Sequence, residues 1–264
     1  MINAILSHLP ASHPWRGNLH HYETLDSTNT EAKKMAAAGA EHGTVLIAEQ
    51  QTGGRGRMGR SFHSPAGSGI YFSVILRPAC PARQLMHLTC AAAVAAAEGI
   101  EAATGLQTGI KWTNDLVFGK KKLGGILTEL SLDSAGNADF AILGIGINCT
   151  QKAEDFPDDI APIATSLAQC AGKKTDRALL LAELLVAVEK MSRQLRERME
   201  ILQQYRKHCI TIGQEISLLR ADTVRHGTAL DVNDDGGLVV RFVDGQVETV
   251  QSGEVSIRGM YGYL

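Results

Sequence analysis

The chain has 264 residues, of which 44% are hydrophobic and 20% are charged, as in ordinary globular proteins with a sizeable core. Its 26 lysines and arginines nearly balance its 28 aspartates and glutamates, so the net charge is −2. A general nucleic-acid or membrane-surface binder would carry a basic excess. The charge balance therefore argues against both classes, and a local cluster of arginines indicates a small anionic ligand instead.

The cysteines and apolar runs suggest the compartment. Five cysteines are scattered without a C-x-x-C pair, so neither a disulfide framework nor a structural zinc site is expected. The N-terminus lacks a charged leading region and is interrupted at Pro10 and Pro14, which is atypical of a signal peptide. No apolar run approaches the roughly 20 residues that span a bilayer. We expect a cytoplasmic protein that does not enter a membrane.

The first elements surround a helix start. Leu19–Leu25 alternates in polarity and predicts a strand. Asp26-Ser-Thr-Asn29 follows, and Thr28 and Glu31 have the spacing of a capping box, so we expect a helix that stops at Gly39. The Ser-Thr-Asn triplet could serve only as a helix cap or could also bind a ligand.

Gln51–Arg60 is the most unusual stretch, because four glycines are interspersed there with three arginines after the predicted strand Val45–Glu49. Its glycines spell G-x-G-x-x-G and nearly spell a P-loop. Both motifs require a helix directly after the loop, but residues 61–69 contain a proline and two glycines. The loop is therefore expected to hold an anion in another way, through guanidinium groups and free backbone N–H groups.

The middle of the chain predicts a sheet with one apolar helix. The predicted strands are Ile70–Leu76, Ile110–Trp112, Leu116–Phe118, Leu123–Leu130 and Ala138–Ile147. Leu85–Ala97 is rich in alanine and predicts a helix packed closely on the sheet. Gly144 and Gly146 interrupt the last strand and suggest a close approach to its backbone.

Two further helices, about Arg177–Arg196 and Met199–His208, precede a change of texture at Gly213. Five short strands separated by turn signals then follow, at Ile216–Leu219, Val224–Val232, Leu238–Val243, Val247–Gln251 and Val255–Ile257. We expect a small β-barrel over residues 211–264, after a catalytic domain of residues 1–210.

No sequence pattern predicts a nucleophile or a metal site, since the chain has no G-x-S-x-G and no cluster with metal-ligand spacing. Lys111 ends a predicted strand beside Trp112. It is either a surface lysine whose stem lies along apolar groups or a cation that stabilises charge on a phosphate or carboxylate. The residues alone leave both open.

Five short motifs resemble those of biotin–protein ligases, in the order found in that family. They are Asp26-Ser-Thr-Asn29, Gly54-Arg-Gly-Arg-Met-Gly-Arg60, Lys111-Trp-Thr-Asn-Asp-Leu116, Lys122-Leu-Gly-Gly-Ile-Leu-Thr-Glu129 and Gly144-Ile-Gly-Ile-Asn148. Gly253-Glu-Val-Ser-Ile257 also resembles the end of the family's C-terminal barrel. One motif alone would be weak, but the ordered set is very specific.

The resemblance implies an α+β fold of the class II synthetase type, with a mixed sheet flanked by helices and an SH3-like C-terminal barrel. It implies that biotin and MgATP form biotinyl-5′-AMP, and that a lysine of a biotin carboxyl carrier domain of acetyl-CoA carboxylase or a related carboxylase then takes the biotinyl group. It also implies the monofunctional type without a DNA-binding domain, and a possible homodimer.

By the same resemblance, Lys111 and Arg57 are the catalytic residues. Those expected around biotin are Ser27, Thr28, Asn29, Gln51, Gly54, Arg55, Gly56, Arg57, Lys111 and Gly125. Those expected at the nucleotide are Arg57, Arg60, Phe62, Lys111, Asn114 and Asn148. Asp115 and Glu129 are candidate carboxylates facing Mg²⁺, although no metal ligand is assigned.

Three residues depart from the family pattern. Met58 replaces a frequent arginine, so that position holds no essential charge here. Thr113 replaces the usual proline and is expected to loosen the backbone after Trp112. Phe62 stands where some members have tryptophan, so stacking could persist with less area.

Three rival functions are disfavoured. Lipoate–protein ligases share the superfamily but lack this glycine–arginine loop, and their pocket would suit a dithiolane. A biotin-responsive DNA-binding regulator needs a recognition helix, which the residues before the first strand do not suggest. An RG-rich nucleic-acid binder disagrees with the net charge.

Overall fold

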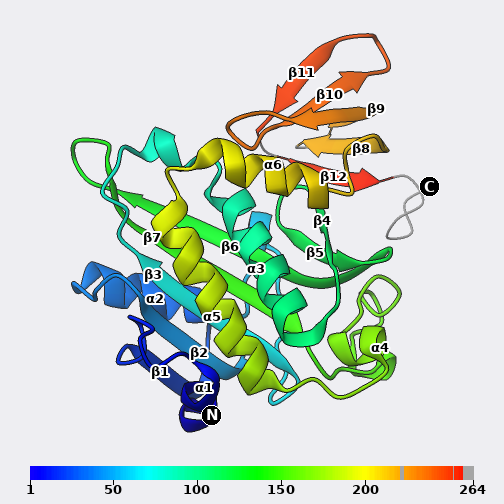
Figure 1. Cartoon of the computed structure of the whole chain (residues 1–264). Coiled ribbons are helices and arrows are strands. Elements are labelled where there is room, and N and C mark those ends of the chain that lie inside the picture. Colours follow the sequence, from blue (N-terminus) through cyan, green and yellow to red (C-terminus); the bar gives the residue numbers. More distant parts are fainter. Residues whose placement is uncertain (221–222, 252, 258–264) are drawn as a thin grey trace.

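The computed structural model describes residues 1–220, 223–251 and 253–257, which form two sheets with helices around them (Figure 1). The larger sheet has seven strands in the order β1-β2-β3-β7-β6-β5-β4, and only β1 and β2 pair in parallel. Its strands are β1 (Leu19–Leu25), β2 (Thr44–Gln51), β3 (Gly69–Leu76), β4 (Gly109–Lys111), β5 (Asp115–Phe118), β6 (Lys121–Leu132) and β7 (Ala138–Asn148). The expected mixed sheet is therefore confirmed.

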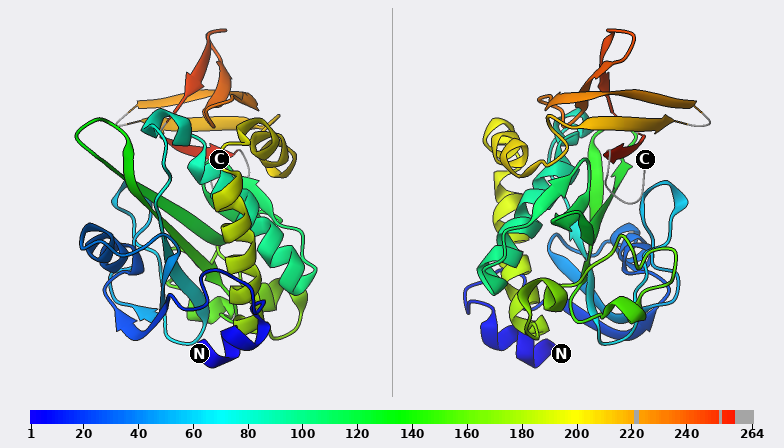
Figure 2. Two further views of the ribbon diagram at one scale, coloured as in Figure 1. Left: turned by 60° about the vertical axis from the view of Figure 1, so that its left-hand side comes forward. Right: turned by 90° about the vertical axis from the view of Figure 1, so that its right-hand side faces the viewer.

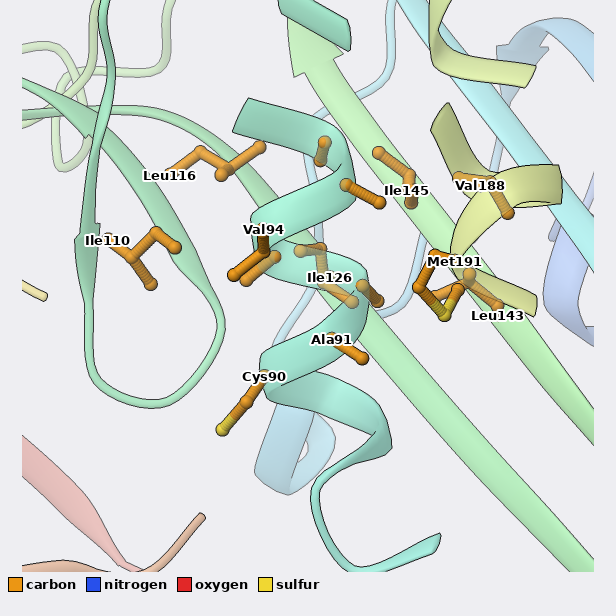
Figure 3. Packing of buried hydrophobic residues seen from close by; sticks show 14 of the residues in the cluster. Cys90, Ala91, Val94, Ile110, Leu116, Ile126, Leu143, Ile145, Val188 and Met191 are labelled. Carbon is orange, nitrogen blue, oxygen red and sulfur yellow. The ribbon is translucent and has the colours of Figure 1, made fainter. Parts of the chain in front are cut away.

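Helices cover both faces of this sheet. On one face lie α3 (Leu88–Thr104) and α5 (Arg177–Gln194), and Figure 3 shows Ala91 and Val94 of α3 close to Ile126 of β6. The alanine-rich α3 approaches its neighbour closely, since a Cβ on Gly99 would lie 2.9 Å from the Cα of Leu184 in α5. Small side chains are what allow this spacing between two helices and a sheet.

The opposite face is covered by α2 (Thr28–Ala37), whose Ala32 and Ala36 pack on Leu46 and Ile142. Three further helices complete the described fold: α1 (Ile2–His8), α4 (Leu167–Ala171) and α6 (Arg198–His208). The sequence patterns missed α1 and α4, because helices of seven and five residues are too short to show a helical period.

The second sheet is antiparallel throughout and has the order β11-β10-β9-β8-β12. Its strands are β8 (Glu215–Arg220), β9 (Thr223–Val232), β10 (Leu238–Phe242), β11 (Val247–Val250) and β12 (Glu254–Ile257). The sequence predicts all five of these strands, because turn residues separate most of them. Within the described ranges, β11 and β12 are the two edge strands and do not pair with each other. The strands expected to form a barrel are therefore described here as an open sheet. Figure 2 shows this sheet at one end of the larger sheet, with the N-terminus at the other end.

Two helix boundaries differ from the predictions. The N-cap of α2 is Ser27, whose Oγ accepts from the N–H of Thr30, so Thr28 is the first helical residue and not the cap. Helix α3 begins at Leu88, after a short 3₁₀ turn, and continues to Thr104, where Gly105 takes a left-handed φ of 74°. A glycine after the last turn ends helices in this way.

Residues Ala82–Thr104 are long and apolar enough to cross a membrane, which the sequence reading did not anticipate. However, 72% of the most apolar window is buried inside the protein. Helix α3 occupies most of this segment and packs between the sheet, α5 and α6, so its apolar surface is satisfied by the core.

Candidate active site

A cavity of about 250 Å³ lies where strands of the larger sheet meet the glycine–arginine loop. Its charged lining consists of Arg55, Arg57, Arg60, Lys111, Lys122 and Asp115. Five cations against one carboxylate make this cavity strongly electropositive within a chain whose net charge is −2. A low-dielectric cavity with this excess of positive charge favours an anionic ligand.

Part of the cavity lining, referred to below as its neutral end, is polar but uncharged and is built by the start of α2 together with Gln51. The Oε1 of Gln51 accepts from both the backbone N–H of Thr28 at 2.8 Å and its Oγ1 at 3.1 Å. The Nε2 of Gln51 donates to the Oγ of Ser64 at 3.0 Å, which fixes the orientation of the amide. The strand β2 and the helix start are thereby joined through one side chain.

Ser73 lies behind this end and completes the network. Its Oγ is 2.7 Å from both the Oγ1 of Thr28 and the Oδ1 of Asn29. The Nδ2 of Asn29 donates to the backbone oxygen of Leu127 at 3.3 Å. A Cβ on Gly144 would stand 2.0 Å from the Oδ1 of Asn29, so the bare backbone of β7 is what leaves room for this amide.

The glycine–arginine loop forms a short hairpin, because Arg55 bridges to Ser61 and residues 57–59 make a single 3₁₀ turn. No α-helix follows it, as predicted, so neither the dinucleotide motif nor the P-loop is present. Met58 takes a left-handed φ of 56° and is 66% exposed. Non-glycine residues rarely adopt this conformation. The Met58 side chain points largely into solvent, so core packing does not hold it in place.

Gly54 is the one predicted biotin residue that does not line the cavity in the described structure. Within the loop, a Cβ on Gly54 would stand 2.4 Å from the backbone oxygen of Phe62. The backbone N–H of Phe62 donates to the oxygen of Gly54 at 2.8 Å. A glycine is therefore needed at position 54 because the two arms of the hairpin approach each other closely there.

Two arginines connect the loop to other parts of the chain, one to Asn114 and one to Glu129 of β6. The Nη1 of Arg57 donates to the Oδ1 of Asn114 at 3.2 Å, and the Nδ2 of Asn114 donates to the backbone oxygen of Ile126 at 2.9 Å. The Nη1 of Arg55 lies 3.2 Å from each carboxylate oxygen of Glu129. Glu129 is therefore an anionic partner of the loop, and it does not belong to the described lining of the cavity.

Lys111 is buried, with 7% of its surface exposed, and it lines the cavity at the end of β4. This position excludes the reading of a surface lysine. Nearby, the Nζ of Lys122 lies 2.6 Å from the Oδ1 of Asp115. Buried or half-buried cations at one wall of a cavity can stabilise negative charge that develops on a bound group.

The remaining predicted residues also line the cavity. Phe62 packs edge-on against Tyr71, and a Cβ on Gly146 would lie 2.6 Å from the Phe62 ring. The Nδ2 of Asn148 donates to the backbone oxygen of Thr165 at 3.0 Å. A Cβ on Gly125 would have no protein neighbour closer than 3.5 Å, so the backbone there is open to a ligand.

The structure adds lining residues that the sequence did not single out. The apolar side chains of Phe156, Ile160 and Ile163 come from the segment between β7 and α4, and Gly253 and Val255 come from the start of β12 and the residue before it. Ser73 gave no signal either, because one serine inside an apolar strand is unremarkable. The closing motif of the chain was the only hint that its C-terminal strands reach the site.

The backbone on both sides of Thr113 is hydrogen-bonded to other parts of the chain. The Trp112–Thr113 peptide is cis, and the backbone oxygen of Thr113 accepts from the hydroxyl of Tyr205 at 3.1 Å. The backbone N–H of Trp112 donates to the Oγ1 of Thr211 at 2.9 Å. The segment after Lys111 is therefore held from both sides.

A thiol nucleophile finds no support among the described residues. Burial raises the pKa of Cys90 and of Cys149 to about 12, so both thiols stay protonated at neutral pH. Neither lines the cavity. No group of three or more His, Cys, Asp or Glu side chains with metal-binding geometry occurs in the described part of the chain either.

Comparison with known proteins identifies the family. Residues 22–148 match the model of the biotin/lipoate A/B protein ligase family, and residues 211–258 match the biotin protein ligase C-terminal domain. The bifunctional ligase/repressor BirA of Bacillus subtilis is 38% identical over 242 residues, which cover 91% of this chain and 74% of that protein.

Two further relatives agree. The biotin–[acetyl-CoA-carboxylase] ligase of Mycobacterium tuberculosis is 34% identical over 236 residues, or 87% of this chain and 85% of that protein. The solved structure of the biotin protein ligase from Aquifex aeolicus in complex with biotin and ATP matches with a TM-score of 0.76 and 31% identity, over 91% of this chain and 98% of the other. This chain belongs to the biotin protein ligase family.

Proposed function

We propose that this biotin protein ligase joins biotin to ATP in the cavity described above and passes the biotinyl group to a lysine of a biotin carboxyl carrier domain. One observation carries the proposal: a neutral polar end built on Thr28 and Gln51 and a cationic wall that includes Lys111 belong to the same cavity. Biotin has the matching polarity, with a ureido ring at one end and a carboxylate at the other.

The neutral end suits the ureido ring. Ser27, Thr28, Asn29 and Gln51 offer both donors and acceptors there, and their mutual hydrogen bonds hold these groups in place before a ligand arrives. A site whose polar groups are already oriented spends less free energy on ordering them when the ligand binds. Gly125 lets the ligand lie directly on the strand backbone.

The cationic wall suits the activation step. A biotin carboxylate oxygen attacks the α-phosphorus of ATP, and the bond from that phosphorus to the pyrophosphate oxygen breaks. Negative charge grows on the α-phosphoryl oxygens meanwhile, so a cation held near them lowers the barrier. We assign this role to Lys111 and Arg57. Arg60, Phe62, Asn114 and Asn148 then contact the nucleotide.

Magnesium fits this site as a partner of the ATP phosphates. Asp115 is the one carboxylate in the described lining, and Mg²⁺ is usually held by one or two carboxylates together with substrate phosphates. Asp115 would hold the ion, which when bound neutralises phosphate charge. Its ion pair with Lys122 keeps the carboxylate oriented until then.

The second step needs no nucleophile from the enzyme. The uncharged amine of a carrier lysine attacks the acyl carbon of biotinyl-5′-AMP, and an amide bond forms. The nitrogen loses one proton to solvent, and AMP leaves with the electrons of the broken bond between the acyl carbon and the phosphate oxygen. The buried, protonated thiols of Cys90 and Cys149 agree with this assignment. Until the carrier arrives, the arginine loop keeps water from the anhydride.

The same proposal covers organisation and location. Residues 1–210 form the catalytic domain and residues 211–264 a supporting C-terminal domain, in keeping with the separate match of residues 211–258. A homodimer would use an edge of the larger sheet such as β1. Five unpaired cysteines suit the reducing cytoplasm.

The test mixes the purified chain with biotin, MgATP and a biotin carboxyl carrier domain, and follows the mass of the carrier. We expect the mass of one biotinyl group to appear on one lysine, and no product when ATP is omitted. Lipoate in place of biotin should leave the carrier unchanged. Labelling with lipoate but not with biotin would overturn the proposal.

A further inference from the structure

The indole of Trp112 connects the cavity to the C-terminal sheet. Trp112 follows Lys111 directly and lines the cavity, but its Nε1 donates to the backbone oxygen of Gly236 at 2.9 Å. Gly236 belongs to the turn between β9 and β10. The residue next to the proposed catalytic lysine is therefore oriented by a turn that lies more than a hundred positions later in the sequence.

This turn, residues 233–237, is rigid by construction. The Oδ1 of Asn233 accepts from the backbone N–H groups of Asp235 at 3.0 Å and Gly237 at 2.8 Å. The backbone N–H of Gly236 donates to the oxygen of Asn233 at 3.0 Å. One side chain thus closes the turn from inside, and the oxygen of Gly236 remains pointed outward at the indole.

Helix α6 fixes the turn on the larger domain. The Nη1 of Arg198 lies 3.0 Å from the Oδ1 of Asp235, and the Nη2 of Arg206 lies 2.9 Å from the Oδ1 of Asp234. The Nε of Arg206 also donates to the backbone oxygen of Val232 at 2.8 Å. Two arginines eight residues apart on one helix, or about two helical turns, therefore set the position of the turn.

Helix α3 forms the third side of this contact. Gly236 has a φ of 84°, and a Cβ on it would stand 2.9 Å from the Sγ of Cys90. A Cβ at this position therefore requires the Cys90 side chain or the turn to shift. The oxygen of Gly236 is thereby held in a gap bounded by Cys90 and Trp112.

We propose that the turn 233–237 is a positioning element for Lys111, and that Trp112 is the positioning residue through which it acts. The indole hydrogen bond fixes Trp112, and the chain before it then presents Lys111 to the cavity in one direction. A displacement of a catalytic group by about 1 Å can cost two orders of magnitude in rate. This inference rests on the role proposed for Lys111.

The first experiment replaces Trp112 with phenylalanine, which keeps an aromatic ring in the core but removes the indole N–H. Biotin-dependent exchange of pyrophosphate into ATP reports adenylate formation. We expect kcat to fall about tenfold, the equivalent of one lost hydrogen bond, while KM for biotin changes less than about twofold. Thermal unfolding checks that the variant is folded.

A matched pair of glycine variants separates positioning from stability. Gly236→Ala and Gly245→Ala both place a side chain at a φ of 84°, but a Cβ on Gly245 would meet nothing within 4 Å. The backbone penalty is therefore the same in both. We expect Gly245→Ala to lower the melting temperature and leave kcat unchanged, and Gly236→Ala to lower kcat as well.

A rescue variant tests the contact directly. Replacing Cys90 with alanine removes the sulfur that a Cβ on Gly236 would meet. We expect the double variant Gly236→Ala, Cys90→Ala to recover most of the lost kcat, with Cys90→Ala alone close to the original enzyme. Because stability and kcat are both measured, a simple loss of folded protein is recognised.

The outcomes are distinct. An unchanged kcat in Trp112→Phe, or equal losses of kcat in Gly236→Ala and Gly245→Ala, overturns the positioning role. If Lys111→Ala itself keeps full activity, the proposed function of Lys111 fails first. If Trp112→Phe keeps the original kcat while Lys111→Ala is inactive, the positioning role of Trp112 and the turn is overturned, but the role of Lys111 stands.

Discussion

The Nη1 of Arg55 lies 3.2 Å from both carboxylate oxygens of Glu129, so the glycine–arginine loop is joined to strand β6 by an ion pair. The Nδ2 of Asn29 donates to the same carboxylate at 3.0 Å. Asn29 at the start of α2 and Arg55 of the glycine–arginine loop therefore share a single anion. This relationship makes Glu129 a link between the two parts of the site.

Glu129→Gln should weaken biotin binding by about two- to fivefold, since an ion pair as exposed as that of Arg55 contributes up to about 1 kcal/mol. Glutamine keeps an oxygen for Asn29 but loses the charge for Arg55. Titration calorimetry measures the change in Kd. Glu248→Gln, which breaks the exposed pair with Arg225 in the C-terminal sheet, is the control and should bind biotin normally.

Lys111→Ala should lower the rate of adenylate formation by at least about a hundredfold, because a buried cation is removed from beside the developing charge. Lys111 is 7% exposed, so unfolding should also be measured. Pyrophosphate exchange gives the rate and thermal unfolding gives the stability. The exposed Lys173 provides the control, since Lys173→Ala should be fully active. A Lys111→Ala enzyme of normal rate would remove the lysine from the mechanism.

Arg57→Ala should release biotinyl-5′-AMP about tenfold faster, since a charge-assisted hydrogen bond to the ligand and the link to Asn114 are both lost. The quantity to measure is free adenylate in solution when no carrier is present. Asn114→Ala should give a smaller effect in the same direction. If the two substitutions act through one contact, their effects on release will not add.

Gly125→Ala should leave the free energy of unfolding within about 0.5 kcal/mol of the original, because its Cβ meets only ordinary contacts. It should nevertheless weaken ligand binding, since the methyl group occupies the open backbone of the cavity. Gly144→Ala is the contrasting case, where the Cβ would meet Asn29 at 2.0 Å and the fold itself should lose stability. Denaturant titrations with and without biotin separate the two.

Stability should fall in mildly acidic solution because of His87. Burial lowers the pKa of His87 below its usual 6.5, and the hydrogen bond from its Nε2 to the backbone oxygen of Leu195 offsets this only in part. The unfolded state therefore binds a proton first as the pH falls. The loss of stability caused by His87 is absent above pH 6.5 and grows as the pH drops below that value. It levels off once the pH is below the pKa of His87 in the folded state.

Denaturant unfolding between pH 8 and pH 5 measures this dependence. His87→Gln removes the titrating group, so its free energy of unfolding should decline less over the same range. Burial also lowers the pKa values of His13 and His42, and part of the decline should therefore remain in the variant. A His87→Gln profile parallel to the original would contradict the assignment.

Much of the fold was accessible from local patterns. The strands of both sheets and the helices α5 and α6 were predicted because alternation, helical spacing and turn residues act over a few positions. The rejection of the P-loop followed from a proline and glycines after the loop. The five ordered motifs identified the family and named most of the cavity lining, including Lys111 and Arg57.

Tertiary contacts decided the rest. Nothing local distinguishes Ser73 from any serine in a strand until β3 is placed beside α2, and the motif that ends in Glu129 does not show that its carboxylate pairs with Arg55 and Asn29. Gly54 and Gly144 are explained only by the atoms that would meet a Cβ. The link from Gly236 to Trp112 joins residues far apart in the chain, because partners in a folded core are chosen by packing and not by sequence distance. The sequence determined the elements and the chemistry they carry; the tertiary structure decided which groups hold that chemistry in place.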